Sequence, residues 1–208
     1  MRLQGDAPSP RDSSRLAPRG YSLRGPRAAA AVAAGLADAQ RYLPPIDPER
    51  LIRTADDLGT QQLLMMSPAT YRKVLKSFHR RYFALIRQYT DAKIFFHSDG
   101  NVVDLLDDLI ESGVEVLNPV QVSAIPEPER LKERFGHRLA FWGGTGSHVT
   151  LPRGTTEDVA EEVALRARQF ATEGGYVIAP AHNVQADVPP QNILAMCDAA
   201  RAKDLGAR

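Results

Sequence analysis

Cysteine is almost absent from this sequence, since Cys197 is the single thiol among 208 residues. One cysteine excludes an internal disulfide framework and a zinc site built mainly from cysteines. No uninterrupted apolar segment approaches the ~18 residues that a membrane-spanning helix needs. The formal net charge is +1, which is too small for the strong field typical of proteins that bind nucleic acid or anionic membranes. We therefore expect a reduced, cytoplasmic setting, with no nucleic acid and no membrane among the partners.

Glycine-rich nucleotide motifs are missing as well. The sequence has neither the Gly-x-Gly-x-x-Gly fingerprint nor a phosphate-binding loop that ends in Lys-Ser/Thr. The glycine-rich stretch 143–146 lacks a third spaced glycine and is weak support for nucleotide binding. The remaining composition, 43% hydrophobic and 25% charged, is typical of a globular domain with a hydrophobic core.

Residues 1–45 differ from the rest of the chain. Residues 1–27 are rich in Pro, Arg, Ser and Gly, and this composition predicts disorder. Residues 28–39 are dense in alanine and are compatible with a helix that buries little surface. The Arg-rich, acid-poor start resembles a transit peptide in composition, and an extension without selected function explains it equally well. We predict two parts, a low-complexity extension over 1–45 and a folded domain over 46–208.

The folded part alternates between candidate strands and candidate helices. Short apolar runs predict strands over 93–96, 114–117, 138–142 and 176–179, with an additional earlier strand over 53–55. Helical spacing and capping signals predict helices over 67–89, 102–110, 128–135, 155–171 and 190–203. Strict alternation implies parallel strands joined by right-handed crossovers. The predicted class is α/β, with about five βα units arranged as part of a (β/α)₈ barrel or as a doubly wound sheet.

Each predicted strand is followed by a polar cluster. The clusters occupy 55–59, 97–101, 117–121, 142–144 and 180–183. The carboxyl ends of parallel strands lie at one edge of the sheet. We therefore expect these five clusters to converge on one site, although they are far apart in the sequence.

Two histidines and an aspartate in these clusters suggest a metal site. His97 and Asp99 are two residues apart on an extended segment, so their side chains can point to the same side, and His182 follows another strand. Two imidazoles and a carboxylate can hold a zinc ion and leave a position open for water or substrate. The alternative is a polar pocket without metal, in which His97 and His182 only form hydrogen bonds.

Other candidates for the site are carboxylates and neutral hydrogen-bonding groups. Asp56 and Asp57 follow the first strand and point apart, so at most one can face the site as a general acid or base; ordering of the loop is the alternative role. Five further residues are predicted to contact substrate: Asn118, Gln121, Trp142, Arg153 and Asn183. Asn118 is equally compatible with turn chemistry before a proline, and Arg153 with a solvated surface position. Outside the predicted site, His79 and His137 are expected at the surface, and Cys197 is expected to be a structural thiol.

The ordered set of motifs resembles the uroporphyrinogen decarboxylase superfamily. The matching segments are Asp56-Asp57-Leu58-Gly59-Thr60-Gln61, Phe96 to Asn101, Leu117 to Gln121, Phe141 to Gly144, and Gly174 through His182-Asn183 to Ile193. The resemblance implies a (β/α)₈ barrel with its active site at the carboxyl ends of the strands. It covers only the C-terminal part of the family, and the Arg-rich segment and catalytic aspartate of the haem-pathway enzyme have no counterpart in residues 1–45.

This resemblance implies two alternative activities. The first is decarboxylation of the acidic side chains of a porphyrinogen in tetrapyrrole biosynthesis, without a cofactor. Asp57 or Asp56 would then hold the pyrrole N–H groups, and His97 and His182 would carry protons. The second is methyl transfer, because the motifs are closer to the branch of cobamide-dependent methyltransferases, in which a His-x-Cys pair and a later Cys bind zinc.

In this sequence the corresponding positions of the methyltransferase branch are His97-x-Asp99 and His182. This reading implies a methylated compound as substrate and a corrinoid protein as partner. Replacing thiolates with His and Asp makes the site harder and favours oxygen substrates over sulfur ones. A third reading is a non-catalytic fragment, because five of eight barrel units leave two open sheet edges. Such a fragment would pair with a second copy or with a complementing barrel half.

Overall fold

The computed structural model describes residues 51–202, and the predicted N-terminal extension lies outside them. Five strands form one sheet in the order β1 (Leu51–Ala55), β2 (Lys93–His97), β3 (Val116–Val120), β4 (Ala140–Thr145) and β5 (Tyr176–Pro180). All four neighbouring pairs are parallel. The spatial order equals the sequence order, whereas a doubly wound sheet reverses its order at a switch point. The fold is therefore α/β and corresponds to part of a (β/α)₈ barrel, as predicted.

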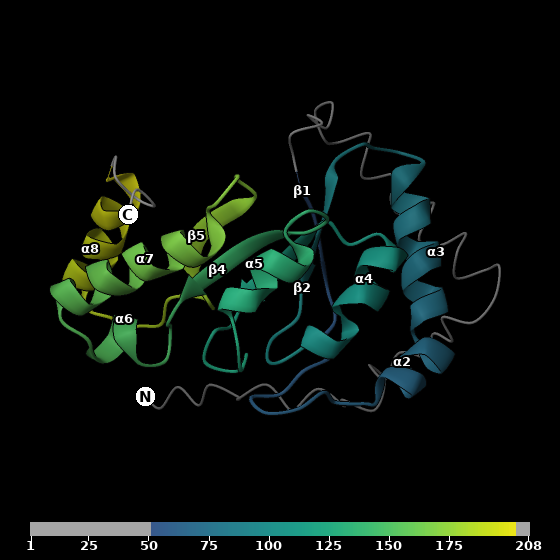
Figure 1. Cartoon of the computed structure of the whole chain (residues 1–208), viewed down its shortest axis with the longest axis horizontal. Coiled ribbons are helices and arrows are strands. Elements are labelled where there is room, and N and C mark those ends of the chain that lie inside the picture. Colours follow the sequence, from purple (N-terminus) through teal and green to yellow (C-terminus); the bar gives the residue numbers. More distant parts are fainter. Residues whose placement is uncertain (1–50, 203–208) are drawn as a thin grey trace, which may run out of the picture. The chain divides into compact units, whose positions relative to one another are not determined.

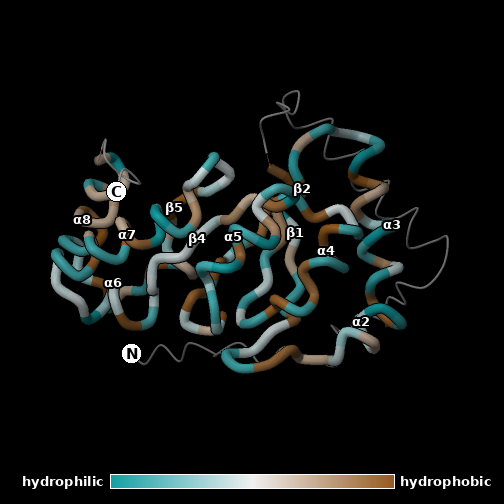
Figure 2. The backbone as a smooth tube through the Cα atoms, in the orientation of Figure 1, coloured by the Kyte–Doolittle hydropathy of each residue, from teal (hydrophilic) through white to brown (hydrophobic). Residues whose placement is uncertain are grey.

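Helices follow the strands in the same sequence along the sheet, from α3 at the right of Figure 1 to α8 at the left. Their bounds are α2 (Pro68–Val74), α3 (Lys76–Arg87), α4 (Leu106–Ser112) with the preceding 3₁₀ turn η2 (Val103–Leu105), α5 (Glu129–Phe135), α6 (Thr150–Arg153), α7 (Thr156–Phe170) and α8 (Pro190–Arg201). These helices carry both hydrophobic and hydrophilic residues, as expected of amphipathic helices (Figure 2). Among residues 51–202, no helix has the length and apolar character needed to cross a bilayer.

Side chains alternate between the two faces of the sheet, so that one face packs in the hydrophobic core and the other is left to line a pocket. Every second side chain of a strand points to the same face of the sheet. Ile94 and Phe96 of β2 and Phe141 of β4 are fully buried, and Phe96 and Phe141 pack against Phe83 of α3 and Phe170 of α7. This face is covered by the helices. Alternate residues between them, such as Phe95 and His97, point to the opposite face.

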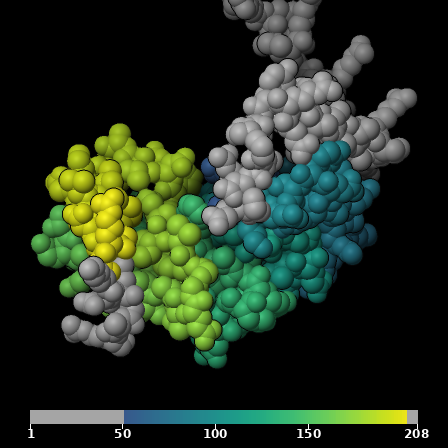
Figure 3. All heavy atoms as spheres, turned by 90° about the horizontal axis from the view of Figure 1, so that it is seen from above, coloured from purple at the N-terminus to yellow at the C-terminus, as the bar shows by residue number. Residues whose placement is uncertain are grey.

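Local signals in the sequence account for most element boundaries. Thr155 and Asp158 form the predicted capping box at the start of α7, with both reciprocal hydrogen bonds present. Gly113 ends α4 in the left-handed conformation, with φ of 117°. α8 packs on α7 through Val159, Ile193 and Met196. In Figure 3, α8 (yellow) and α3 (blue-teal) lie at opposite ends of the described part.

Several element boundaries differ from the predictions; the strand predicted over 114–117, for example, is β3 over Val116–Val120. The helix expected over 67–89 is divided into α2 and α3 at Leu75, and this change of direction brings Tyr71 and His79 into contact. β4 continues through Gly143 and Gly144, which were expected to follow the strand. The reason is their pairing with Ile178 and Ala179 of β5, which extends the ladder to Thr145 and Pro180.

Candidate functional site

A pocket of about 370 Å³ lies at the carboxyl ends of the strands. Residues from all five strands contribute to it, and inward positions of neighbouring strands stand in register: Arg53 pairs with Phe95, and His97 pairs with Asn118. The residues that follow β5, His182 and Asn183 among them, line the same pocket. The structure thus brings together, in this pocket, residues from four of the five clusters that the sequence placed at the strand ends.

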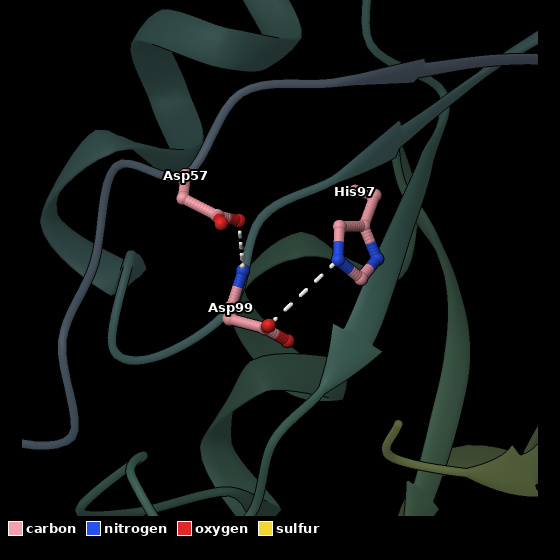
Figure 4. Close-up of side chains that lie close together, drawn as sticks. All are labelled: Asp57, His97 and Asp99. Atoms are coloured by element: carbon pink, nitrogen blue, oxygen red, sulfur yellow. Dashed lines mark hydrogen bonds and ion pairs between the residues drawn. The ribbon is translucent and has the colours of Figure 1, made fainter. Parts of the chain in front are cut away.

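His97 and Asp99 lie close together, as predicted, and Asp57 joins them. Donor atoms of Asp57, His97 and Asp99 lie within 4.8 Å of one another. Figure 4 shows the Asp57 carboxylate directed at the backbone of Asp99, whose own carboxylate is directed at the His97 ring. The backbone N–H of Asp99 donates to Asp57 Oδ1 at 3.1 Å, and His97 Nε2 lies 3.8 Å from Asp99 Oδ2.

His182 completes the predicted trio. Its Nε2 atom lies 3.7 Å from Asp99 Oδ2, and its ring centroid is 6.3 Å from that of His97. The two histidines therefore lie at the same end of the sheet. His182 is more exposed than His97, with 42% against 16% of the side chain accessible, so it stands at the mouth of the pocket.

The orientation of the His97 ring is set by Asn118. His97 Nδ1 lies 2.7 Å from Asn118 Oδ1, and the amide nitrogen of Asn118 donates to the Trp142 carbonyl at 3.5 Å. Because the amide nitrogen is the donor in the second contact, the oxygen accepts the proton of His97 Nδ1. The lone pair of His97 then lies on Nε2, which faces Asp99. This is the usual arrangement of a metal-binding imidazole and its outer hydrogen-bond partner.

The loops that carry Asp57 and Asp99 are joined by hydrogen bonds of their backbone N–H groups. Leu58 N donates to the buried Ser98 hydroxyl at 2.9 Å, and Asn101 N donates to the Thr60 carbonyl at 2.9 Å. A Cβ atom on Gly59 would lie 2.7 Å from the Asp99 carbonyl oxygen, closer than real contacts allow. Glycine at this position therefore permits the close approach of the two loops.

The other predicted site residues have different positions. Trp142 forms a pocket wall, edge to face with Phe95 at 5.4 Å between centroids. Gln121 is buried and accepts the backbone N–H of Gly100 at 2.8 Å, so its oxygen orders a loop. Arg153 ends α6 and lies in a groove along α6 and α7, not in the strand-end pocket. It belongs to a short helix that was not predicted, and the predicted contact of Arg153 with substrate in the strand-end pocket has no support in this position.

Asp56 and Asp57 point apart, as predicted. Asp56 Oδ2 lies 3.3 Å from His79 Nε2, while Asp57 belongs to the cluster with His97. His79 was expected at the surface, but it is buried at 9% exposure. The prediction was wrong because His79 shares the apolar side of α3 with Phe83 and Ile86. Its spacing of four from Leu75 and Phe83 is a signal in the sequence that could have indicated burial.

Arg53 is a charged residue of the pocket that the sequence did not indicate. It lies on β1 beside Phe95 and lines the pocket together with His97 and His182. The short strand 53–55 was predicted, but the face on which Arg53 lies follows only from the register with β2. A guanidinium there gives the pocket a cationic side.

Comparisons with known proteins point to one family. Residues 55–203 match the family model described as uroporphyrinogen decarboxylase (URO-D). A methyltransferase from Methanosarcina mazei has a similar structure, with a TM-score of 0.57 and 26% sequence identity over 73% of this chain. The chain spans 41% of the length of that methyltransferase. No curated protein matches the sequence.

Proposed function

Since this chain belongs to the uroporphyrinogen decarboxylase family, we propose that its strand-end pocket is an active site that holds a divalent metal ion and takes part in methyl transfer. The observation that carries this proposal is the cluster of Asp57, His97 and Asp99, with donor atoms within 4.8 Å of one another. The similarity to a methyltransferase supports the reaction class.

The donor set fits a divalent metal such as zinc. It offers one imidazole nitrogen and two carboxylates, which are established zinc ligands. The bond from His97 Nδ1 to Asn118 leaves Nε2 available, and the bond from Asp99 N to Asp57 Oδ1 leaves the second oxygen of Asp57 available. Asp57 replaces His182 as the third ligand of the predicted set, and His182 stands beside Asp99 as a further donor.

A bound zinc ion would lower the pKa of a coordinated hydroxyl, water or thiol and so produce a nucleophile at neutral pH. The protein's own residues would bind and orient the acceptor. Trp142 and Phe95 provide an apolar wall, Asn183 lies at the mouth, and His182 can accept the proton that the acceptor loses. Nitrogen and oxygen donors form a harder site than thiolates, which favours an oxygen acceptor. The methyl donor would be a methylated corrinoid presented by a partner protein.

Decarboxylation of a porphyrinogen is the second candidate. Arg53 favours it, because a guanidinium at the pocket edge can bind a substrate carboxylate. In this reaction the bond to the carboxylate carbon breaks, carbon dioxide leaves, and His97 or His182 delivers a proton to the remaining carbon. Asp57 would hold the pyrrole N–H groups, and no metal would be required.

Metal binding by the purified full chain tests the first proposal. We expect about one zinc per chain by elemental analysis and a saturable isotherm by titration calorimetry. His97→Ala and Asp57→Asn should each weaken zinc binding by at least tenfold, because each removes a ligand. His137→Ala is the matched control, since His137 is exposed outside the pocket, and it should bind zinc like the wild type. Equal affinity in all four proteins would contradict the proposed site.

Turnover assays separate the two reactions. Methylcobalamin serves as the methyl donor, with alcohols and thiols as acceptors, and loss of the methyl group is followed by absorbance. Zinc-dependent demethylation that His97→Ala abolishes would support methyl transfer. Metal-independent conversion of uroporphyrinogen to products with fewer carboxylates would overturn it in favour of decarboxylation, and Arg53→Ala should then raise KM more than it lowers kcat.

A further inference from the structure

A buried histidine lies behind the pocket, on the side of the sheet covered by helices. His79 of α3 is surrounded by three aromatic rings, those of Tyr71, Phe83 and Phe96, at centroid distances of 5.4–5.7 Å. Both ring nitrogens nevertheless have polar partners. Nδ1 lies 2.8 Å from the Tyr71 hydroxyl, and Nε2 lies 3.3 Å from Asp56 Oδ2.

The direction of these hydrogen bonds follows from the chemistry of the partners. An ionised carboxylate only accepts, so His79 Nε2 carries the proton and Nδ1 accepts from the Tyr71 hydroxyl. Burial lowers the pKa of His79, against the opposing effect of Asp56, which keeps the ring neutral. Burial also raises the pKa of Tyr71 to about 12, so the hydroxyl retains its proton. The hydrogen bonds from Tyr71 to His79 and from His79 to Asp56 therefore run in the same donor-to-acceptor direction.

Asp56 connects this series of hydrogen bonds to the proposed metal ligands in two ways. Its backbone N–H donates to the carbonyl of His97 at 3.1 Å. Its neighbour in the sequence is Asp57, and side chains of successive residues in an extended chain point to opposite sides. When His79 holds the Asp56 carboxylate on the helix side, Asp57 is therefore left to face His97 and Asp99.

We propose that His79 is a positioning residue of the metal site, which acts through Asp56 to place Asp57 and the backbone of His97. This inference rests on the proposed function, because it concerns the ligands of that site. His79 itself lies behind the sheet and contacts none of the three ligands. Its effect is to decide which of two adjacent carboxylates lies beside His97 and Asp99.

A purely structural role makes a different prediction. If His79 only fills space among the aromatic rings, phenylalanine should replace it, and the affinity for zinc should not change. If His79 acts through its Nε2 proton, glutamine should replace it better, because the amide N–H of glutamine can reach Asp56. The two substitutions therefore distinguish positioning from packing.

Zinc affinity and thermal unfolding of the full chain, measured on the same samples, test the inference. We expect His79→Phe to weaken zinc binding about tenfold, in the range found for outer partners of metal ligands, and His79→Gln to remain within threefold of wild type. Asp56→Ala should match His79→Phe. Because both act through one contact, the double variant should bind no more weakly than either single variant. Asp56 is exposed, so Asp56→Ala keeps the test valid if His79→Phe does not fold.

Two results would overturn the inference. One is a zinc affinity of His79→Phe within twofold of wild type, whatever its melting temperature, and the other is full additivity in the double variant. If the wild type itself binds no zinc, the proposed function fails, and NMR of the metal-free protein decides the inference separately. The ¹³C shift of the Asp57 carboxyl and the ¹⁵N shifts of the His97 ring should change in His79→Phe and return in His79→Gln, and unchanged shifts would refute the positioning role.

Discussion

At the scale of single residues, neighbours in the sequence have contrasting environments. Asp56 and Asp57 are the same amino acid at consecutive positions, yet one contacts a buried imidazole and the other accepts the backbone N–H of Asp99. His97 and His79 differ in the same way. His97 has one nitrogen bonded to Asn118 and the other facing Asp99, while both nitrogens of His79 are engaged. Chemical role therefore depends on which partners surround each group.

The pH dependence of stability is a prediction at this scale. Burial lowers the pKa of His79 in the folded protein, so the unfolded chain binds the proton more tightly. Stability then falls as the pH drops below the pKa of an unfolded histidine, about 6.5. In His79→Gln this loss disappears, and we expect the free energy of unfolding to change less between pH 7 and pH 5. Urea denaturation at several pH values measures the difference.

The control for this prediction is His137→Gln. His137 is exposed between α5 and β4, so its removal should leave the pH dependence close to that of the wild type. An identical slope in His79→Gln and the wild type would show that protonation of His79 does not contribute.

At the scale of elements, a buried carboxylate joins α2 and α3 to α4. Asp108 of α4 is 4% exposed and accepts hydrogen bonds from Arg72 Nε at 2.9 and 3.0 Å and from Lys76 Nζ at 2.6 Å. Burial would raise the pKa of Asp108, but the two cations outweigh it and lower the pKa. This contact holds the helix pair that carries Tyr71 and His79 against the rest of the described domain.

Neutralising Asp108 should destabilise the domain. Asp108→Asn leaves Arg72 and Lys76 without the charge that compensates them, and a hydrogen bond to a charged group contributes about 1.5–3 kcal/mol. We expect a loss of about 2–3 kcal/mol in the free energy of unfolding, measured by urea denaturation at pH 7.

Glu111→Gln is the matched control, because it removes another carboxylate that pairs with Lys76. The Glu111 side chain is 63% exposed, and exposed pairs contribute under about 1 kcal/mol. A similar loss in both variants would mean that burial does not strengthen the Asp108 contacts.

At the scale of the whole described domain, the parallel sheet determines where chemistry can occur. Helices cover one face through Phe96 and Phe141, and the strand ends with the opposite face form the pocket. Because Asp57, His97 and His182 lie at the ends of three different strands, a ligand that binds them links distant parts of the fold. Binding should therefore stabilise the domain as a unit.

Zinc should raise the melting temperature of the full chain. At a free concentration a hundredfold above Kd, linkage adds about 2.7 kcal/mol, which corresponds to about 5–10 °C for a domain of this size. Differential scanning fluorimetry with added zinc measures the shift, and addition of a chelator should reverse it. His97→Ala should show little shift; an equal shift in that variant would place the zinc elsewhere.

Residue patterns in the sequence were sufficient to predict the class of fold and the convergence of polar residues at the strand ends. Strand-like and helix-like segments alternate along the sequence, and this alternation indicated parallel βα units. Because the carboxyl ends of parallel strands lie at one edge of the sheet, the convergence of His97, Asp99 and His182 could be predicted. The capping box of Thr155 and Asp158 was also predicted, because it depends on residues three apart. These features arise from local spacing and from a general property of parallel sheets.

Contacts between elements were decided only by the tertiary structure. The register of β1 with β2 placed Arg53 in the pocket, the packing of α3 buried His79 and gave Asp56 its partner, and the position of α6 removed Arg153 from the strand ends. A sequence specifies which side chains follow each strand, but not how far a helix turns or slides against the sheet. That choice depends on packing among residues far apart in the chain, and it determined that Asp57, rather than Asp56, lies beside His97.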